Sequence, residues 1–572
     1  MHDVVRDVAI SIKSKDKDAL LGQDGVDAWP EKDDYTCCKV ISLWASCNVR
    51  GLPNRLECPE LRTLVLGSSD ASRLELPNSF FEGTKKLEVL VLNKMKLTPS
   101  SLSHLVGLRM LYLSGCELVN LSFIKELKNL KILVIGYIYE FKEMILEIGK
   151  LTSLRFLDLR KFNDDIGFLS GFLSCLSDLE ELYISREYNR WEVEGNASIV
   201  EINSLTCLTA LDIYIPTHVF LRLPKNLPSF QLLTKYKIWI GCGPYSVLGQ
   251  HKETKVLGLG GIPLMDRLDV LIANAEVLFL FYLEGLKKVL HDRDGEWFLD
   301  LKVLAVELCQ DMEHLLGKPK WSSKTHGPSP LGSFGKLRVL KVYFCTSMKY
   351  LFSASSARCL PKLHKLDVEG CSALEEIIRG DEEVTDKIIF HQLKELKLVS
   401  LPNLRSIYAN TKKTSTTEYS MPSTVTQPLF NEKVMFPVLE ELYIYGLYSI
   451  KAIWDKQLLP VLKVGDSFQH LQRLVAFNCK EMKEILAFEV GQGEAAAEAN
   501  NEISVFPHLK TIQLWFLSNL KSSEEETKKS RLQALVNHKV RFSSLKNLEI
   551  YECYRARECR SEISVAVSKC VQ

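Results

Sequence analysis

Hydrophobic residues along most of the chain follow one short pattern that returns every few tens of residues. In the stretch FPVLEELYIYGLYSIKAIW the apolar side chains stand at Phe436, Leu439, Leu442, Ile444 and Leu447. A long helix needs apolar residues three and four apart, and an ordinary strand alternates throughout, so neither fits. The frame is L-x-x-L-x-L, and its return predicts an internal repeat.

Copies of this frame run through most of the sequence. Taking the first apolar residue of each copy as its anchor, the earlier anchors are Leu61, Leu87, Leu108, Leu130, Leu154, Leu179 and Leu208. The later anchors are Leu301, Leu337, Leu363, Leu393, Leu439, Leu471, Leu509 and Leu545, which stand further apart because polar loops are inserted. A period of about 20–29 residues built on this frame is the leucine-rich-repeat signature.

The frame also predicts the fold. Its second and third apolar residues alternate, which predicts a short strand that turns both side chains inward. One strand cannot bury this face alone, whereas stacked copies form a parallel sheet over a continuous core. We therefore predict an α/β repeat solenoid, a leucine-rich-repeat horseshoe with a parallel β-sheet on its concave face. In the quoted copy, Leu442 and Ile444 are predicted to be buried and Glu441, Tyr443 and Tyr445 exposed beside them.

The chain divides into three segments by pattern. Residues 1–35 carry apolar residues at helical spacing from Val4 to Ile12, followed by DAWPEKDD, which predicts a short helix and a linker. Residues 36–315 hold the N-terminal half of the repeats, and residues 316–572 hold the C-terminal half with the longer loops. The repeats leave no room for an independent catalytic domain, so we expect no enzyme.

Charge and hydropathy narrow the classes of partner. The chain has 72 basic and 71 acidic residues, a formal net charge of +1, so no overall field favours nucleic acid or an anionic membrane. No apolar run reaches the length of a transmembrane helix. Asp3, Arg6 and Asp7 interrupt the stretch where a signal peptide needs an apolar core, so we expect a cytoplasmic chain that is not secreted by its own signal.

The cysteines follow the repeat. Of the 16, six stand eight residues after an anchor leucine, namely Cys116, Cys309, Cys345, Cys371, Cys479 and Cys553. This is the Asn/Cys position of the repeat, where a small side chain packs inside the turn after the strand. Leu447 occupies the same position in another copy, and no C-x-x-C pair occurs. We therefore predict buried, reduced thiols and no metal site.

Two parts of the sequence resemble a known family. His2 and Asp3, followed by VVRDVAISIKSKD, a tryptophan-proline link and CCKVISL, resemble the end of the nucleotide-binding region of a plant intracellular immune receptor. The FPxLxxLxIxxLxxLxxIW copies resemble the C-terminal leucine-rich repeats of the coiled-coil class of those receptors. The resemblance implies the recognition and autoinhibitory part of a disease-resistance protein, which senses a pathogen effector or a guarded host protein and restrains signalling.

The resemblance also bears on cofactors and partners. In the family, the histidine of this motif lies near the phosphates of the bound nucleotide, and His2 is the matching position. Because the sequence holds no G-x-x-x-x-G-K-[ST] phosphate loop, His2 and Asp3 have no nucleotide site to complete, and we expect no cofactor. ADP or ATP is expected only in full-length members. The implied partners are a protein ligand and the receptor's own nucleotide-binding and signalling domains.

Two other classes of protein remain open at this point. One is the substrate-recruiting part of a ubiquitin-ligase adaptor, which needs an F-box-like helical segment before its repeats. The other is a receptor ectodomain, which needs a signal peptide, cysteine-paired caps and L-x-G-x-I-P turns. The sequence shows only a short helix before the repeats and none of the ectodomain features.

Exposed strand positions of the C-terminal repeats form the candidate binding surface. Adjacent strands lie about 4.7–4.9 Å apart, so equivalent positions in neighbouring copies form a lateral array. Exposed aromatic side chains among mixed charges are typical anchors of protein interfaces. The alternatives are that these aromatic residues only shield a broad sheet, or that the inserted loops carry recognition. The predicted stripe consists of Lys365, Asp367, Glu369, Glu395, Lys397, Glu441, Tyr443, Tyr445, Gln513, Trp515, Glu549 and Tyr551.

Overall fold

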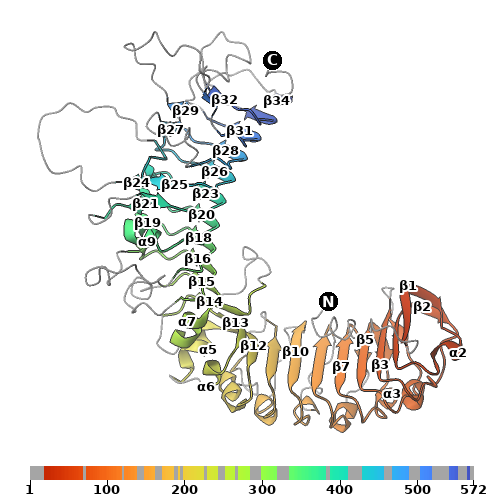
Figure 1. Cartoon of the computed structure of the whole chain (residues 1–572). Helices are drawn as coiled ribbons and strands as arrows, with labels where there is room; N and C mark the ends of the chain where they lie inside the picture. The colour runs from red at the N-terminus through yellow and green to blue at the C-terminus, as the bar shows by residue number, and fades with distance from the viewer. Residues whose placement is uncertain are drawn as a thin grey trace, which may run out of the picture. The chain divides into compact units, whose positions relative to one another are not determined.

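The structure is a computed structural model, and its described residues form two compact units, Met1–Lys255 and Val256–Gln572. Each unit is a stack of repeats (Figure 1). The predicted helix at residues 4–12 lies outside the described residues. The structure describes residues 19–68, 73–118, 122–137, 147–161, 170–185, 191–192, 198–224, 228–241, 252–263, 268–283, 298–317, 334–381, 387–409, 428–455, 467–482, 484–487, 503–504, 506–517, 540–551 and 563–566.

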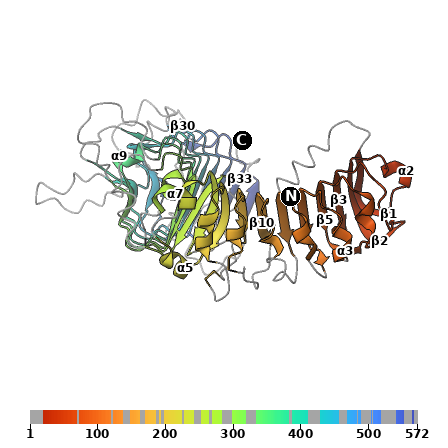
Figure 2. The ribbon, with the colours of Figure 1, turned by 90° about the horizontal axis from the view of Figure 1, so that it is seen from below.

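A sheet of parallel strands in chain order forms one face of the first unit, and Figure 2 shows this row of strands from below. The strands are β1 Ala19–Ala28, β2 Val40–Arg50, β3 Thr63–Ser68, β5 Val89–Asn93, β7 Met110–Ser114, β9 Ile132–Gly136, β10 Phe156–Lys161, β11 Glu181–Ile184, β12 Ala210–Ile215 and β13 Lys235–Ile240. Within residues 1–35, where the sequence predicts only a short helix and a linker, residues 19–28 form a strand that pairs in parallel with β2.

Short elements connect these strands on the other face of the unit. The α-helices are α2 Lys32–Tyr35, α3 Pro99–Leu102, α5 Thr217–Arg222 and α6 Pro228–Gln231. The 3-10 helices are η1 Phe80–Gly83, η2 Ser122–Glu126, η3 Leu173–Cys175 and η4 Ile199–Ser204. A small parallel sheet contains β4 Leu74–Glu75, β6 Met95–Leu97 and β8 Glu117–Leu118.

The second unit repeats the same plan. Its face strands are β14 Lys255–Gly260, β15 Val277–Phe281, β16 Val303–Glu307, β18 Val339–Tyr343, β20 Lys365–Glu369, β23 Glu395–Val399, β26 Glu441–Tyr445, β28 Arg473–Phe477, β31 Thr511–Trp515 and β33 Asn547–Tyr551. These strands are parallel, and β34 Ile563–Ala566 adds one antiparallel strand beside β33.

Short strands, rather than 3-10 helices, line the opposite face of the second unit. Figure 1 shows β19, β21 and β24 on the side away from β18, β20 and β23. These strands begin at His314. The elements of this face are β17 His314–Leu316, β19 Tyr350–Ser353, β21 Glu376–Arg379, β24 Ser406–Ala409, β22 Ile388–Ile389, β25 Val434–Met435, β27 Ala452–Asp455, β29 Glu484–Ala487, β30 Ile503–Ser504, β32 Val540–Arg541, α7 Asp269–Asn274 and α9 Ala354–Ala357.

The leucine frame builds the core of each unit. In β26, Leu442 and Ile444 are 1% and 0% exposed, which confirms their predicted burial. Glu441 is exposed as predicted, whereas Tyr443 and Tyr445 are half-buried. Leu442 lies directly opposite Leu396 in β23 and Leu474 in β28, so the inward leucines stack from repeat to repeat. Burying one such side chain contributes about 1.5–3 kcal/mol.

One left-handed residue directly follows each face strand of the second unit from β14 to β31. Examples are Leu308 with φ 55°, Phe344 with φ 54° and Gly370 with φ 68°. Their N–H groups donate to the last strand carbonyl of the next repeat, as from Phe344 to Glu369 at 2.7 Å and from Gly370 to Val399 at 2.9 Å. This hydrogen bond offsets the cost of the left-handed conformation and continues the stack one residue beyond the sheet.

The buried thiols follow the left-handed residues. Cys116, Cys345, Cys371 and Cys479 are free and buried, as predicted, and so is Cys309, whereas Cys553 lies outside the described residues. The Sγ atom of Cys479 lies 3.5 Å from the carbonyl oxygen two residues earlier. Burial raises the pKa of Cys116 and of Cys479 to about 11. Cys116 and Cys479 therefore close the turn after their strands as neutral thiols.

Candidate functional site

The predicted stripe lies on five strands of the second unit, β20, β23, β26, β31 and β33. Strand register brings its twelve residues onto one face in three lateral rows. The first row is Lys365, Glu395, Glu441, Arg473, Thr511 and Asn547. The middle row is Asp367, Lys397, Tyr443, Val475, Gln513 and Glu549. The last row is Glu369, Val399, Tyr445, Phe477, Trp515 and Tyr551.

The stripe as predicted omits one strand. β28 lies between β26 and β31 and contributes Arg473, Val475 and Phe477 to the three rows. The signal was present in the sequence, because the frame anchored at Leu471 yields these positions with the same offsets that yield the others. Phe477 matters most, since it joins the aromatic residues on either side.

Four aromatic side chains are consecutive in the last row, and we call Tyr445, Phe477, Trp515 and Tyr551 the aromatic row. The rings of Tyr445 and Phe477 stack with centroids 4.9 Å apart, and Phe477 meets Trp515 edge-on at 5.8 Å. Phe516 lies 5.1 Å from Phe477 and 5.4 Å from Tyr551. All four residues of the row are half-buried. Such ring pairs contribute about 0.5–1.5 kcal/mol each, so the row is held in place before any partner arrives.

Charged side chains dominate the other end of the stripe. Asp367 is 4% exposed and accepts a hydrogen bond of 2.9 Å from the Tyr343 hydroxyl. Lys397 Nζ lies 3.6 Å from Asp367 Oδ1 and 3.7 Å from Glu369 Oε2. Burial, together with the charge of Asp367, raises the pKa of Tyr343. These charges neutralise one another within the protein, so the aromatic row offers the stronger anchor for a partner.

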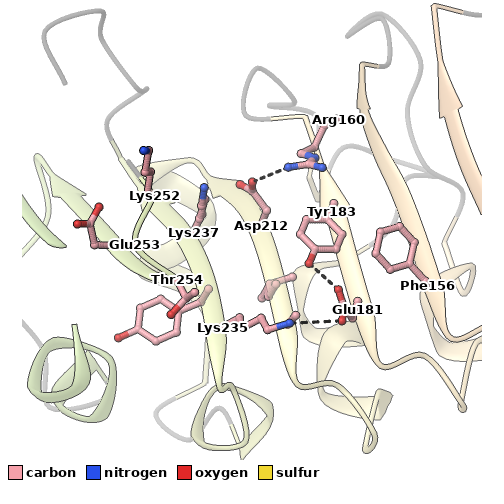
Figure 3. A pocket seen from close by; sticks show the side chains of 13 residues that line it. Phe156, Arg160, Glu181, Tyr183, Asp212, Lys235, Lys237, Lys252, Glu253 and Thr254 are labelled. Atoms are coloured by element: carbon pink, nitrogen blue, oxygen red, sulfur yellow. Dashed lines mark hydrogen bonds and ion pairs between the residues drawn. The ribbon is translucent and has the colours of Figure 1, made fainter. Parts of the chain in front are cut away.

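The first unit has a depression of about 390 Å³ on its sheet face (Figure 3). Arg160 lines it and binds Asp158 through one edge of its guanidinium, at 3.1 Å from Nε to Oδ1 and 2.8 Å from Nη2 to Oδ2. Its Nη1 atom lies 3.8 Å from Asp212 Oδ2, and its guanidinium lies 4.7 Å from the ring centroid of Tyr183. Tyr183 in turn donates a 2.6 Å hydrogen bond to Glu181.

Both signs of charge line this depression. Asp212, which lines the depression, is 1% exposed, and Asp158, which binds Arg160 from beside it, is 4% exposed. Although burial opposes it, the hydrogen bond and charge of Asp158 raise the pKa of Arg160. Figure 3 shows Lys237 between Asp212 and Lys252, so cationic side chains lie beside the carboxylate of Asp212. This balance favours the mixed polar surface of a protein over an anion or a cation alone.

The stripe predicted from the sequence covers only the C-terminal repeats and so missed this depression. The position four residues after each anchor gives Lys397 and Tyr443 in the second unit. The same offset from Leu154, Leu179 and Leu208 gives Asp158, Tyr183 and Asp212. The signal was therefore the repeat frame itself, applied to the earlier copies.

The remaining sequence predictions concern the nucleotide-proximal residues, a metal site and a membrane span. His2 and Asp3 lie outside the described residues, so the structure does not place them. Among the described residues, no group of three or more His, Cys, Asp and Glu side chains is arranged to hold a metal ion. No helix in the described ranges is both long and apolar enough to span a membrane.

Stacked parallel strands that each carry the L-x-x-L-x-L frame define a leucine-rich-repeat protein. Residues 312–423 and 420–559 match the family described as plant disease resistance protein RPS2-like, leucine-rich repeats. The resemblance to plant disease-resistance proteins is therefore confirmed for the repeats, while membership of the coiled-coil class stays a prediction.

Curated relatives agree with this assignment. The chain is 25% identical over 468 residues to disease resistance protein At4g27190 of Arabidopsis thaliana, covering 71% of this chain and 45% of the relative. It is 31% identical over 420 residues to probable disease resistance protein At1g61190 of the same plant, covering 71% of this chain and 35% of the relative. The chain thus spans less than half the length of these relatives.

Solved structures resemble the chain more distantly. One is the leucine-rich-repeat ectodomain of the plant membrane receptor kinase GASSHO1/SCHENGEN3 from Arabidopsis thaliana. The identity is 16% and the TM-score 0.42, and the match covers 91% of this chain and 57% of that chain.

Proposed function

We propose that the chain is the protein-recognition module of a plant innate-immune receptor. It contacts a pathogen effector or a guarded host protein, and it restrains signalling by contacting the receptor's own nucleotide-binding and signalling domains in the cytoplasm. The observation that carries this proposal is the aromatic row, because it lies on the open sheet face of the repeats that match disease-resistance proteins.

The aromatic row has the physical properties of an interface anchor. Its rings pack against one another, so little side-chain entropy is lost when a partner binds. Its half-buried aromatic surface can be fully removed from water only by another molecule. The neighbouring charges of the stripe are already paired, which fixes the orientation of a partner more than it adds affinity. These properties support contact between proteins rather than catalysis.

The relatives favour an immune receptor over the two other classes. The curated matches are named disease resistance proteins. A ubiquitin-ligase adaptor or a receptor ectodomain has no comparable support from a specific feature of this sheet face. The sensing of an effector, the restraint of signalling and the cytoplasmic location remain parts of the proposal.

The test is to weaken the aromatic row without unfolding the repeats. Wild-type chain and the triple variant Tyr445→Ala, Phe477→Ala, Trp515→Ala are immobilised and exposed to extracts of healthy and infected leaves, and retained proteins are quantified by mass spectrometry. Each protein lost from the variant is then purified and its affinity for the chain measured. When the three replacements are made one at a time, we expect each to weaken binding at least about 30-fold, since central interface aromatics contribute about 2 kcal/mol or more.

The matched control is Tyr350→Ala in β19, which removes the same kind of side chain from the opposite face of the unit. Circular dichroism must show the same fold for all variants. If the triple variant folds normally and retains the same proteins with unchanged affinity, the aromatic row is not the recognition surface.

A further inference from the structure

Three large side chains follow the face strands of consecutive repeats near the start of the second unit. Tyr282 is 57% exposed and Phe344 is 42% exposed, and Leu308 between them is half-buried. They directly follow Phe281, Glu307 and Tyr343, which lie opposite one another in β15, β16 and β18. We call Tyr282, Leu308 and Phe344 the apolar edge.

The fold alone does not require large side chains on the apolar edge. All three residues are left-handed, with φ between 49° and 55°. Gly261, Gly370 and Gly446 occupy the same position in other repeats, and glycine adopts this conformation without steric cost. Bulky residues here carry strain of about 1 kcal/mol each and expose apolar surface to water.

Phe344 is held in one orientation by its neighbour. A Cβ atom built on Gly370 would lie 2.3 Å from Phe344 Cδ1, so the ring lies directly against the backbone of Gly370. The Phe344 N–H also donates to Glu369 O at 2.7 Å, and Gln310 Nε2 donates to Phe344 O at 3.0 Å. The exposed ring is therefore fixed before any partner binds.

A carboxylate lies beside this edge. Glu307 is half-buried, in register between Phe281 and Tyr343. Within the described part of the chain no cation pairs with it, whereas Glu369 two strands away is paired with Lys397. On the neighbouring strand, burial lowers the pKa of Lys341, while the carboxylates of Asp367 and Glu395 act on that lysine in the opposite direction. Burial and the charge of Glu369 raise the pKa of Glu307.

We propose that Glu307, Tyr282 and Phe344 form a subsite that accepts one lysine or arginine side chain of a protein partner. The proposal rests on the proposed function and adds a chemical requirement for the partner. The carboxylate pairs with the cationic group, the aromatic rings attract it through their faces, and Leu308 covers its alkyl stem.

Other occupants fit this subsite less well. A purely apolar segment would remove the Glu307 carboxylate from water without giving it a partner, which is costly. An acidic segment would be repelled by Glu307 and Glu369 together. A cationic side chain satisfies both the carboxylate and the rings.

The test uses two small probes on the full chain. Acetyl-Leu-Arg-Leu-amide and its citrulline counterpart, which replaces the cation with a neutral group of similar shape, are measured by ligand-observed saturation-transfer NMR. We expect the arginine peptide to bind about tenfold more tightly than the citrulline peptide. Glu307→Gln should abolish that preference, and Phe344→Ala should weaken both peptides.

The control is Asp300→Asn, which neutralises an exposed carboxylate of the same repeat outside the stripe and should leave the arginine preference unchanged. Absence of binding, equal binding of the two peptides, or an unchanged preference in correctly folded Glu307→Gln protein overturns the proposal. The aromatic-row triple variant should keep the arginine preference. The two proposals can fail separately. If only Glu307→Gln loses the arginine preference, while the triple variant retains the same leaf proteins as wild type, the proposed recognition surface is wrong and the subsite is supported.

Discussion

At the scale of single residues, the sheet faces of the two units differ in whether their buried charges have a partner of opposite sign. In the first unit, Arg160 is enclosed by two nearly inaccessible carboxylates, Asp158 and Asp212. In the second unit, Glu307 is half-buried without a pairing cation in the described part of the chain. The first arrangement compensates its buried charges within the fold, whereas the second lowers the stability of the fold and agrees with the proposed subsite for a cationic side chain.

This difference predicts the stability of Glu307→Gln. Because the pKa of Glu307 is raised in the folded protein, its charged form is disfavoured by folding, and the penalty is full above the raised pKa. Neutral glutamine removes that penalty. We expect Glu307→Gln to melt at a higher temperature than wild type near pH 7. The two melting temperatures should converge as the pH falls below about 4.3, the pKa of an unfolded glutamate, because the carboxyl group then becomes protonated in both states. Thermal melts across this pH range measure the difference in melting temperature between the variant and wild type. A variant that is less stable than wild type at neutral pH contradicts the prediction.

The opposite outcome is expected at Arg160. Arg160→Leu removes the cation that binds Asp158 at 2.8 Å and lies 3.8 Å from Asp212. Leaving these buried charges less compensated should cost about 2 kcal/mol or more. The loss should shrink at acidic pH as the carboxylates become protonated. Urea unfolding at two pH values measures both effects, with Arg155→Leu, an exposed arginine of the same repeat, as the control.

At the scale of elements, the sequence predicts the inner strands well because their signal is local. The residues of β26 alternate inward and outward, and the frame names Leu442 and Ile444 without reference to any other strand. The edge strand β1 was missed because its residues carry no frame and form a strand only by pairing with β2. The opposite-face strands, such as β19 and β21, also depend on pairing between repeats.

The candidate site shows the same limit. The frame gives which side chains face outward, so the predicted stripe and the omitted Phe477 follow from it. The left-handed conformation of Tyr282 and Phe344 does not follow, because it is fixed by a hydrogen bond to the next repeat. Whether a charge is paired, as at Lys397, or has no pairing cation among the described residues, as at Glu307, depends on distances between strands that are remote in the sequence.

The left-handed positions give a prediction at this scale. Gly261 and Gly370 both end a face strand with positive φ, but a Cβ atom meets nothing within 4 Å at Gly261 and meets the Phe344 ring at Gly370. Replacing either with alanine incurs the conformational cost of about 1 kcal/mol. Gly370→Ala must also move the ring, so we expect it to destabilise the protein more and to weaken binding of the arginine peptide. Equal unfolding free energies for the two variants would show that the ring moves freely.

At the scale of the whole molecule, the two proposed contacts fall within one compact unit. The aromatic row and the Glu307 subsite both lie within Val256–Gln572, while the Arg160 depression lies within Met1–Lys255. The strands between Glu307 and Tyr445 are β18, β20 and β23, whose stripe residues are mostly paired charges. A partner that spans this face would therefore place a cationic side chain at one end and an apolar surface at the other.

This arrangement predicts that the second unit is sufficient for both contacts. A repeat stack is stabilised by each repeat and its neighbours, so a compact unit with its own core can fold without the rest of the chain. We expect residues 256–572, produced alone, to show the circular dichroism of a β-rich fold and to bind acetyl-Leu-Arg-Leu-amide with the affinity of the full chain. Residues 1–255 should not distinguish the arginine peptide from the citrulline peptide. If residues 256–572 fold but bind the arginine peptide much more weakly than the full chain, the subsite requires the first unit, and the assignment of both contacts to one unit is wrong.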